Sequence, residues 1–600
     1  MDAVRGRCVR RWGNRACRDA CFSNCTCVHI DGLQYPPRVS GRFVLWPYAP
    51  GVAALFTAGV LVSTACGTRP PVPERPQPIA YADTLPIPEP PERDINEVTR
   101  LVQVAVSGEV AAALGPRAWL GAGREALNLD RFDDVPNSAW YERRNRGGSM
   151  TPAEVRRGPS TTDGPTDGPL TIVAAKVEGI SPGFTVEDAR GDRYVLKFDP
   201  KGFIYLSTAA GVISNRLLYA AGYHVPEDYL FHFTFDRLRV EPGATYEDAG
   251  FVERPLTLDI AREALTRTDT LPDGRYVAVA SKFVPGPPKG PFLFEGRRKD
   301  DPNDWYPHEH RRELRGLRVV SAWINHVDMR FMNTLDAYVP PGYLRHYLID
   351  FAATLGSGTI RPHEPREGLE YNLDFWDSFG RLVTLGFYRV GWEEADWAPI
   401  HPTIGWLRGE GFEPGRWKAN WPNQAFRYLT PADAYWGAKL VGSFDESRIR
   451  AAVAAGGLPD PWAGDTLATI LMTRRDAVVR HWYARVSPVE RPHVAMSGES
   501  VTVTFDDLGL RDGPWSADGS RYSWRFEDPS RGVRREGTNG GGTGYEVTLT
   551  VPDVAAPDRA GAVATLDVRI VRAGSGVEPE PARIYLRWSG DAYEVTGLEH

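Results

Sequence analysis

The sequence predicts an α+β protein with a two-lobed core, made of a β-rich N-lobe and a helical C-lobe, followed by a small all-β sandwich domain. The first observation behind this prediction is that residues 170–198 alternate apolar and polar side chains around two turn sequences, which is typical of short antiparallel strands. The second is that apolar residues recur at helical spacing from residue 310 to about 486. The third is that the period returns to two over residues 487–600.

Length and charge limit the possible functions. A chain of 600 residues that is 42% hydrophobic and 24% charged is typical of a globular protein with two or more domains. The formal net charge of −7 is small for this size, and no block of Lys and Arg dominates the main body. Binding to nucleic-acid phosphates needs concentrated positive charge, so we expect no nucleic-acid partner.

The N-terminal region has the features of an export signal. The stretch Phe43–Cys66 carries no charge, follows Arg38 and Arg42, and ends in small residues before a cysteine. Its last residues, VSTAC, resemble the lipobox of bacterial lipoproteins, although Ser63 stands where that family usually has Leu. The resemblance implies lipidation at Cys66 and a membrane-anchored lipoprotein of the bacterial cell envelope, on the periplasmic or extracellular face. A single membrane-spanning helix is the alternative, because the run is just long enough to cross a bilayer.

Residues 1–42 are rich in Arg and contain every cysteine except Cys66. Their spacing fits no standard pair of zinc-ligand pairs, and a zinc knuckle before an export signal has no evident use. A misassigned start codon, with translation from Val39, explains them better. We therefore treat residues 1–66 as a dubious extension plus the signal and lipobox segment.

Residues 67–93 are Pro-rich without periodicity, which predicts an extended linker. Residues 94–169 are expected to form a helical lead-in and a polar, Gly-rich loop, so that the first compact unit begins near residue 170. The expected N-lobe, residues 170–288, contains three short strands, a helix over 209–221, and two further strand-like runs, YLFHFTF and YVAVASKFV.

The expected C-lobe covers residues 289–486. Its first helix begins near His310 and ends near Asn325, with apolar residues on one face. A later helix is expected to begin at Thr430, an N-cap residue followed by Pro431 at the first helical position. Residues 487–600 alternate with period two between loops and predict the C-terminal β domain.

Several polar residues occur in a recognisable order. Lys197 lies on the third predicted strand, behind a turn that contains glycine. The stretch INHVDMRFMNTLD then places Asp328 and Asn333 in a His-x-Asp-x-x-x-x-Asn arrangement, and an apolar strand ends in Asp350-Phe351. These parts together resemble the protein-kinase-like superfamily, with the atypical HipA-like and phosphatidylinositol-kinase-like branches nearest in pattern, over about residues 170–358.

The resemblance implies ATP and Mg²⁺, or Mn²⁺, as cofactors. Lys197 would hold the nucleotide phosphates, and Asp328 would be the base or orienter of the acceptor hydroxyl. Asn333 and Asp350 would be metal ligands, since hard cations prefer such oxygens. The turn over the phosphates would contain Lys176, Gly179 and Gly183, and the adenine would bind at the connection between the lobes, residues 281–288. The function implied is transfer of the γ-phosphoryl group to an unknown acceptor.

The chain also departs from the kinase pattern. No acidic residue occurs between Lys201 and Pro226, so the helix after Lys197 lacks the Glu that normally pairs with this lysine, and Gly211 stands near its place. Ala352 replaces the Gly of Asp-Phe-Gly. The alternative function is therefore a catalytically inactive, pseudokinase-like scaffold that contacts an envelope protein or glycan. Residue by residue, Lys197 could also be a solvated lysine at a strand end, and Asp328 with Asn333 could serve only turn chemistry after a helix.

Two further clusters carry candidate chemistry. Residues 298–314 combine carboxylates with a His-x-His sequence that could ligate zinc, or that could form a charged loop leading into a helix; they are Asp300, Asp301, Asp304, His308, Glu309 and His310. Residues 416–436 concentrate aromatic side chains that could stack on sugars, or that could be core and inter-lobe packing; they are Trp417, Trp421, Phe426, Tyr428, Tyr435 and Trp436.

Overall fold

The computed structural model of the chain describes residues 82–95, 100, 125–176, 182–248, 252–372, 380–385, 387, 392, 398–538 and 540–600. All of these residues belong to one compact unit, Pro71–His600. The expected lipidation site Cys66 and the expected phosphate-turn residue Gly179 lie outside the described residues. Within the described ranges, no helix has the length and apolar character needed to cross a membrane.

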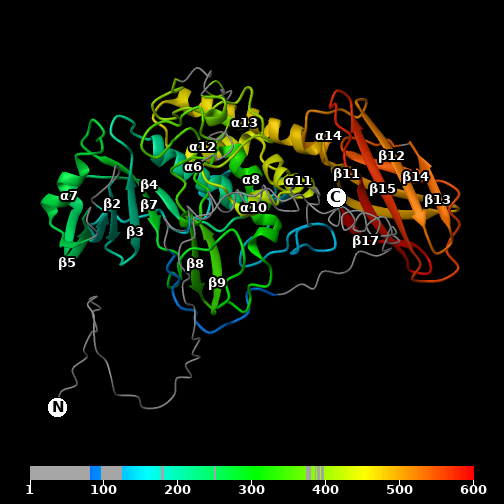
Figure 1. The fold of residues 1–600 in the computed structure, drawn as a ribbon, viewed down its shortest axis with the longest axis horizontal. Coiled ribbons are helices and arrows are strands. Elements are labelled where there is room, and N and C mark those ends of the chain that lie inside the picture. The colour runs from blue at the N-terminus through cyan, green and yellow to red at the C-terminus, as the bar shows by residue number, and fades with distance from the viewer. Residues whose placement is uncertain are drawn as a thin grey trace, which may run out of the picture. The chain divides into compact units, whose positions relative to one another are not determined.

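The N-terminal half of the unit is built on a seven-stranded sheet with the order β4-β7-β3-β2-β1-β5-β6 (Figure 1). Its neighbours are antiparallel except for the parallel pair β1 and β5. The strands are β1 (Leu170–Lys176), β2 (Gly183–Glu187), β3 (Arg193–Phe198), β4 (Asp228–Phe233), β5 (Leu238–Glu247), β6 (Glu253–Pro255) and β7 (Tyr276–Lys282). The three strands expected within residues 170–198 are therefore confirmed, and alternating residues of β2 and β3 are buried.

Helix α6 (Leu206–Ala221) contacts β4, β7 and β3 of this sheet. It begins three residues before the expected start because Asp199 caps its N-terminus. The Asp199 carboxylate accepts hydrogen bonds from the backbone amides of Tyr205, Ser207 and Thr208 at 2.8–2.9 Å. Helix α7 (Leu258–Leu265) packs near β5, within the insertion between β4 and β7.

The following part is mostly helical, as the sequence predicts, but a hairpin of β8 (Thr334–Val339) and β9 (Tyr343–Leu348) interrupts it. Helix α8 (Arg312–Ile324) ends at Asn325, whose φ of 51° is the left-handed conformation that terminates a helix. The remaining helices are α10 (Gln424–Arg427), α11 (Pro431–Gly442), α12 (Glu446–Ala455) and α13 (Pro461–Tyr483). Helix α11 begins as predicted, with a capping box between Thr430 and Asp433.

Residues 125–169, which were expected to end a helical lead-in and form a loop, contribute to the largest hydrophobic core. Val135, Trp140, Tyr141 and Val155 are all buried there against residues of α6, α8 and α11. The short elements of this segment are η2 (Arg146–Gly148) and α5 (Pro152–Arg157). Apolar side chains separated by Gly, Asn and Arg carry no periodicity, which is why the sequence did not indicate their burial.

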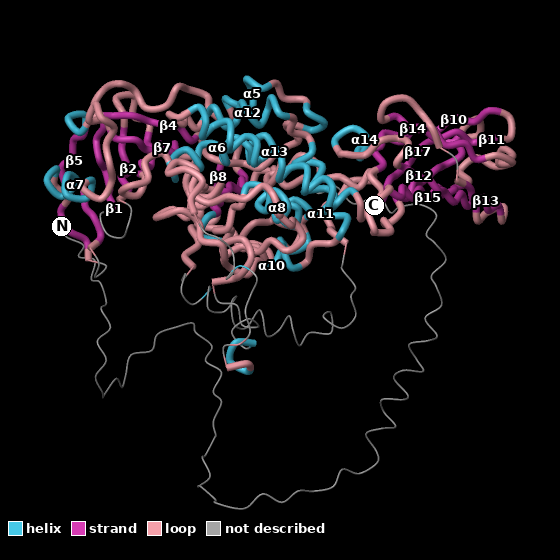
Figure 2. The backbone as a smooth tube through the Cα atoms, turned by 90° about the horizontal axis from the view of Figure 1, so that it is seen from above, coloured by secondary structure: helices cyan, strands magenta, loops and turns pink. Residues whose placement is uncertain are grey.

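The C-terminal residues form two sheets that share one core, as the predicted β domain requires. One sheet has the order β10-β11-β14 and the other β13-β12-β15-β16-β17. Their strands are β10 (Val489–Ser497), β11 (Ser500–Asp507), β12 (Ser520–Asp528), β13 (Val533–Gly537), β14 (Glu546–Val551), β15 (Val563–Arg572), β16 (Ala582–Trp588) and β17 (Tyr593–Glu599). The short helix α14 (Leu508–Asp512) lies beside these strands (Figure 2).

Candidate functional site

A cavity of about 670 Å³ lies between the N-terminal sheet and the segment that follows β9. Residues from β1, β2 and β3 line it on one side, including the predicted site residues Lys176, Gly183 and Lys197. Asp350 and Phe351 line it on the other side. Four of the predicted site residues, distant in the sequence, therefore share one cavity.

The ion pair between Lys197 and Asp350 joins the two sides of this cavity. The Lys197 Nζ lies 2.9 Å from the Asp350 Oδ2, and both side chains are about two-fifths exposed. Burial raises the pKa of the Asp350 carboxyl, but the charge and hydrogen bond of Lys197 outweigh it, so this pKa lies below its usual value. Asp350 also has a φ of 62°, an uncommon conformation for a residue other than Gly and one found often at functional positions.

Asp328 and Asn333 form a hydrogen-bonded loop next to this cavity. The Asn333 Nδ2 donates to the backbone oxygen of Asp328 at 2.7 Å and to its Oδ2 at 3.0 Å. Arg330 pairs with the Asp328 Oδ1 at 3.0 Å. The Ile349 amide donates to the Asn333 carbonyl at 3.0 Å, which fixes the loop one residue before Asp350. Neither Asp328 nor Asn333 lines the cavity itself.

His326 connects the end of α8 to the residues around Asp350. Its amide donates to the Ser321 carbonyl at 2.8 Å, and its ring lies edge-on to Phe351 with centroids 5.9 Å apart. Burial lowers the pKa of His326 to about 4, so the ring is neutral at physiological pH. A neutral, fully buried ring suits packing between the two segments better than proton transfer.

One of the two residues predicted to hold a divalent cation lies on the cavity. Asp350 supplies a carboxylate on the cavity, and the amide nitrogen of Asn333 is used by Asp328, so the Asn333 oxygen is the atom that could take a cation. Of Asp350 and Asn333, only Asp350 is acidic, and neither is a histidine. Among the described residues, no three His, Cys, Asp or Glu side chains are grouped to hold a metal.

The sequence reasoning missed Asp228, a buried carboxyl group that lines the same cavity. Asp228 pairs with Ser281 across β4 and β7, and Ser281 pairs with Val195 of β3, so Asp228 and Lys197 point to the same face of the sheet. Among the described residues, no group forms a hydrogen bond with the Asp228 Oδ1. Burial raises the pKa of Asp228 to about 6. A carboxylate at the start of a predicted strand, just after Pro226 and Glu227, gave no signal of burial.

Replacing Asp228 with Asn is expected to change how stability depends on pH. A carboxyl whose pKa rises from 3.8 to about 6 on folding stabilises the protein below pH 4, and this contribution is lost as the pH rises to 6. Asn does not titrate, so the variant does not lose this contribution. The free energy of unfolding of the variant minus that of the original protein should therefore rise by up to about 3 kcal/mol between pH 4 and pH 7. Urea unfolding of both proteins at the two pH values measures the change, and parallel pH profiles would contradict it.

Helix α6, which contains no acidic residue, lies along the cavity. It contributes Ser207, Thr208 and Gly211 to the cavity, so the helix faces Lys197 with hydroxyl groups and a glycine. A Cβ atom at Gly211 would lie 3.5 Å from Val279, which is ordinary contact. Steric crowding therefore does not require glycine here. In this structure Asp350, and no residue of α6, is the carboxylate paired with Lys197.

The second predicted cluster is a buried structural network. His308 bonds to Asp304 at 2.8 Å, and Asp304 also accepts from the Arg311 guanidinium at 3.3 Å. Burial alone would raise the pKa of Asp304. The charge and hydrogen bond of His308 and the charge of Arg311 outweigh burial, so this pKa lies below its usual value. His310 is bonded to Arg315 at 2.7 Å. These residues lead into α8, as the alternative of a charged loop expects, but Asp301, Asp304, His308 and His310 are buried, whereas that alternative expects a solvated loop.

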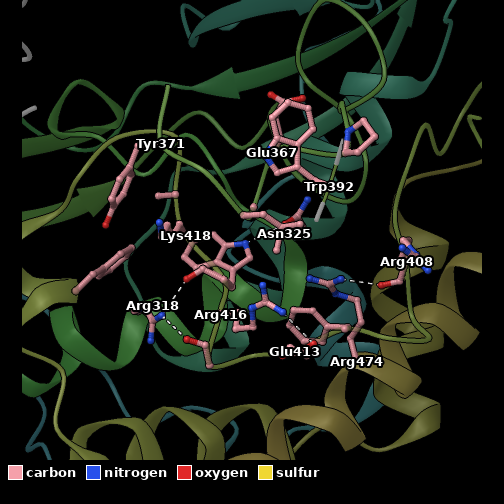
Figure 3. A pocket seen from close by; sticks show the side chains of 18 of the residues that line it. Arg318, Asn325, Glu367, Tyr371, Trp392, Arg408, Glu413, Arg416, Lys418 and Arg474 are labelled. Atoms are coloured by element: carbon pink, nitrogen blue, oxygen red, sulfur yellow. Dashed lines mark hydrogen bonds and ion pairs between the residues drawn. The ribbon is translucent and has the colours of Figure 1, made fainter. Parts of the chain in front are cut away.

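The predicted aromatic cluster divides between the core and a second cavity. Trp417, Tyr435 and Trp436 are at most 2% exposed. Trp417, Trp421 and Phe426 line a cavity of about 880 Å³ bounded by α8, α13 and the segments between residues 365 and 429 (Figure 3). Packing therefore explains Tyr435 and Trp436, whereas half-buried Trp421 and Phe426 face a space that could receive a ligand.

Comparisons with known proteins do not assign this chain to a family. No family model and no curated protein sequence matches it. Among solved structures, the twitchin kinase region of C. elegans is 13% identical, with 66% of this chain and 72% of that chain covered and a TM-score of 0.16. The chicken interferon gamma receptor alpha chain is 14% identical over 17% of this chain and 50% of that chain, with a TM-score of 0.13. Likenesses this weak carry no argument, so the fold class stands as a mixed α+β arrangement.

Proposed function

We propose that the chain has an atypical two-lobed, kinase-like core that binds ATP with Mg²⁺ or Mn²⁺ and transfers the γ-phosphoryl group to a hydroxyl acceptor. The observation that carries the proposal is the ion pair of Lys197 with Asp350 across a cavity of about 670 Å³. A lysine on a sheet and a carboxylate on the opposite wall are the two charges needed to hold phosphates and a metal in one place.

Each predicted residue has a role in this proposal. Lys197 would bind phosphate oxygens, and Asp350 with Asn333 would hold the cation. The chemistry that such a cation would supply is positive charge against the negative charge that develops on the phosphate oxygens. Asp328, held by Arg330 and Asn333, would orient the acceptor hydroxyl and accept its proton. Lys176 and Gly183, with Gly179 between them in the sequence, would cover the phosphates.

Replacing Asp328 with Asn is expected to slow phosphoryl transfer without weakening nucleotide binding. The amide retains the shape and can still accept from Asn333, but it cannot accept the acceptor's proton, so turnover should fall about a hundredfold or more. The measurement is the release of ADP and of labelled product by the full chain with γ-labelled ATP and Mg²⁺, and EDTA is the control. Equal turnover of the two proteins would contradict the role given to Asp328.

A second candidate is a nucleotide-binding or empty scaffold that contacts envelope proteins or glycans. It is favoured by α6, which offers hydroxyl groups and Gly211 where an acid would complete an active kinase site. The same experiment separates the two candidates. ATP binding without turnover in the original protein would support the scaffold.

The proposed location follows from the N-terminal sequence alone. We place the protein in the bacterial cell envelope as a lipoprotein anchored through Cys66, with its folded unit on the periplasmic or extracellular face and an envelope component as its partner. Replacing Cys66 with Ser should release the protein from the membrane fraction. Retention of that variant in the membrane would favour a spanning helix.

A further inference from the structure

The cavity of about 880 Å³ is larger than the proposed nucleotide cavity and is separate from it in its lining residues. Figure 3 shows Arg318, Arg408 and Arg474 around it, drawn from α8, from the segment before α10 and from α13. Among the described residues that line this cavity, six are Lys or Arg and two, Glu367 and Glu413, carry a carboxylate. These described lining residues therefore carry an excess of positive charge.

Three of these cations have no carboxylate partner among the described residues. In the described part of the chain, Arg318, Arg408 and Arg474 make no ion pair, and Glu413 is paired with Arg416 at 3.4 Å. Arg474 is 4% exposed, and among the described residues it donates to the carbonyl groups of Ala322, Trp323 and Arg408 and lies 3.6 Å from the centroid of the Phe412 ring. Because burial removes its hydration, the pKa of Arg474 falls to about 9. A buried cation without a carboxylate favours the entry of an anion.

Aromatic rings line the same cavity. Trp417 and Phe426 have ring centroids 6.2 Å apart, and Trp421 lies between them in the sequence and also lines the cavity. Polar groups occur among the rings, including Asn325, which accepts from the Trp417 Nε1 at 2.9 Å. Flat aromatic faces, amide groups and guanidinium groups together are suited to a ring that carries hydroxyl groups and a negative charge.

We propose that this cavity is a binding site for an anionic sugar, bearing either a phosphate or a carboxylate. The cations would bind the anionic group and the aromatic faces would contact the sugar ring. The cavity also adjoins the Asp328 loop, because the Asn420 amide donates to the Val327 carbonyl at 2.7 Å. The binding proposal does not depend on ATP, so its failure and that of the proposed phosphotransfer can be told apart.

The test is isothermal titration of the full chain at about 50 mM salt, without nucleotide or metal. The probes are glucose 6-phosphate, glucuronate, glucose and inorganic phosphate. We expect one or both anionic sugars to bind at least about tenfold more tightly than glucose and than inorganic phosphate. The first two probes distinguish a phosphate-bearing from a carboxylate-bearing ligand, and binding of either supports the site.

Two variants locate the binding. Arg408 is exposed and its side chain makes no ion pair among described residues, so Arg408→Glu should fold normally and weaken binding at least tenfold. Trp421→Ala should weaken binding of the sugars but not of inorganic phosphate. Arg521→Glu, an exposed arginine on β12 far along the chain, is the matched control and should bind like the original protein. No binding of any probe at about 10 mM, or equal binding by the Arg408 variant, would overturn the proposal.

Discussion

Replacing Asp433 with Ala is expected to lower the free energy of unfolding by about 3–5 kcal/mol. The Asp433 carboxylate is completely buried and lies 3.0 Å from the Arg312 Nε and 2.8 Å from the Arg315 Nη1. Its Oδ2 also accepts from the Thr430 amide at 3.0 Å and completes the cap of α11. Without the Asp433 carboxylate, the buried guanidinium groups of Arg312 and Arg315 each lose an ionic partner between α8 and α11, where water cannot replace that partner.

Urea unfolding followed by tryptophan fluorescence measures this loss. Asp465→Ala is the control, because Asp465 makes a similar ion pair with Arg450 at 2.7 Å but is 72% exposed. That variant should lose no more than about 1 kcal/mol, since water screens an exposed pair. If the two variants lost the same small amount, the buried network would not hold α8 and α11 together as described.

The elements that the sequence predicted are those with a regular period. The strands β1 to β3, the helix α6 and the C-terminal strands follow from alternation or helical spacing, and the start of α11 follows from the capping residue Thr430 and from Pro431. Residues 125–169 were missed because their buried side chains, such as Trp140 and Tyr141, follow no period. Tertiary contacts with α6 and α8 determine the burial of these side chains, and the local sequence pattern does not predict such contacts.

The candidate site was predicted by order along the chain rather than by any single motif. The order Lys197, Asp328, Asn333, Asp350 singled out two residues that form an ion pair and two that form the adjoining loop, but it did not predict the ion pair itself. The sequence did not predict that Asp228 lines the cavity, because strand pairing determines its position. β4 lies beside β7, which brings this carboxyl to the face of the sheet that carries Lys197. The surplus of cations around the second cavity likewise arises from segments far apart in the sequence.

Asp350→Ala is expected to abolish nucleotide binding while the protein stays folded. The pair with Lys197 is about two-fifths exposed, so its loss should cost no more than about 1 kcal/mol of stability. Its loss should matter far more for a ligand, because Asp350 is the carboxylate proposed to hold the cation against the phosphates. A folded variant without binding therefore separates the role in the site from a role in the fold.

The measurement that tests the central claim most directly is a thermal-shift titration of the full chain with ATP and Mg²⁺ or Mn²⁺. A ligand that binds only the folded state must raise the melting temperature, and ATP at a hundred times its dissociation constant stabilises by about 2.7 kcal/mol. The account predicts a metal-dependent rise that Asp350→Ala loses and that Asp465→Ala keeps. No rise at millimolar ATP, or an equal rise in the Asp350 variant, would contradict a nucleotide site at Lys197 and Asp350.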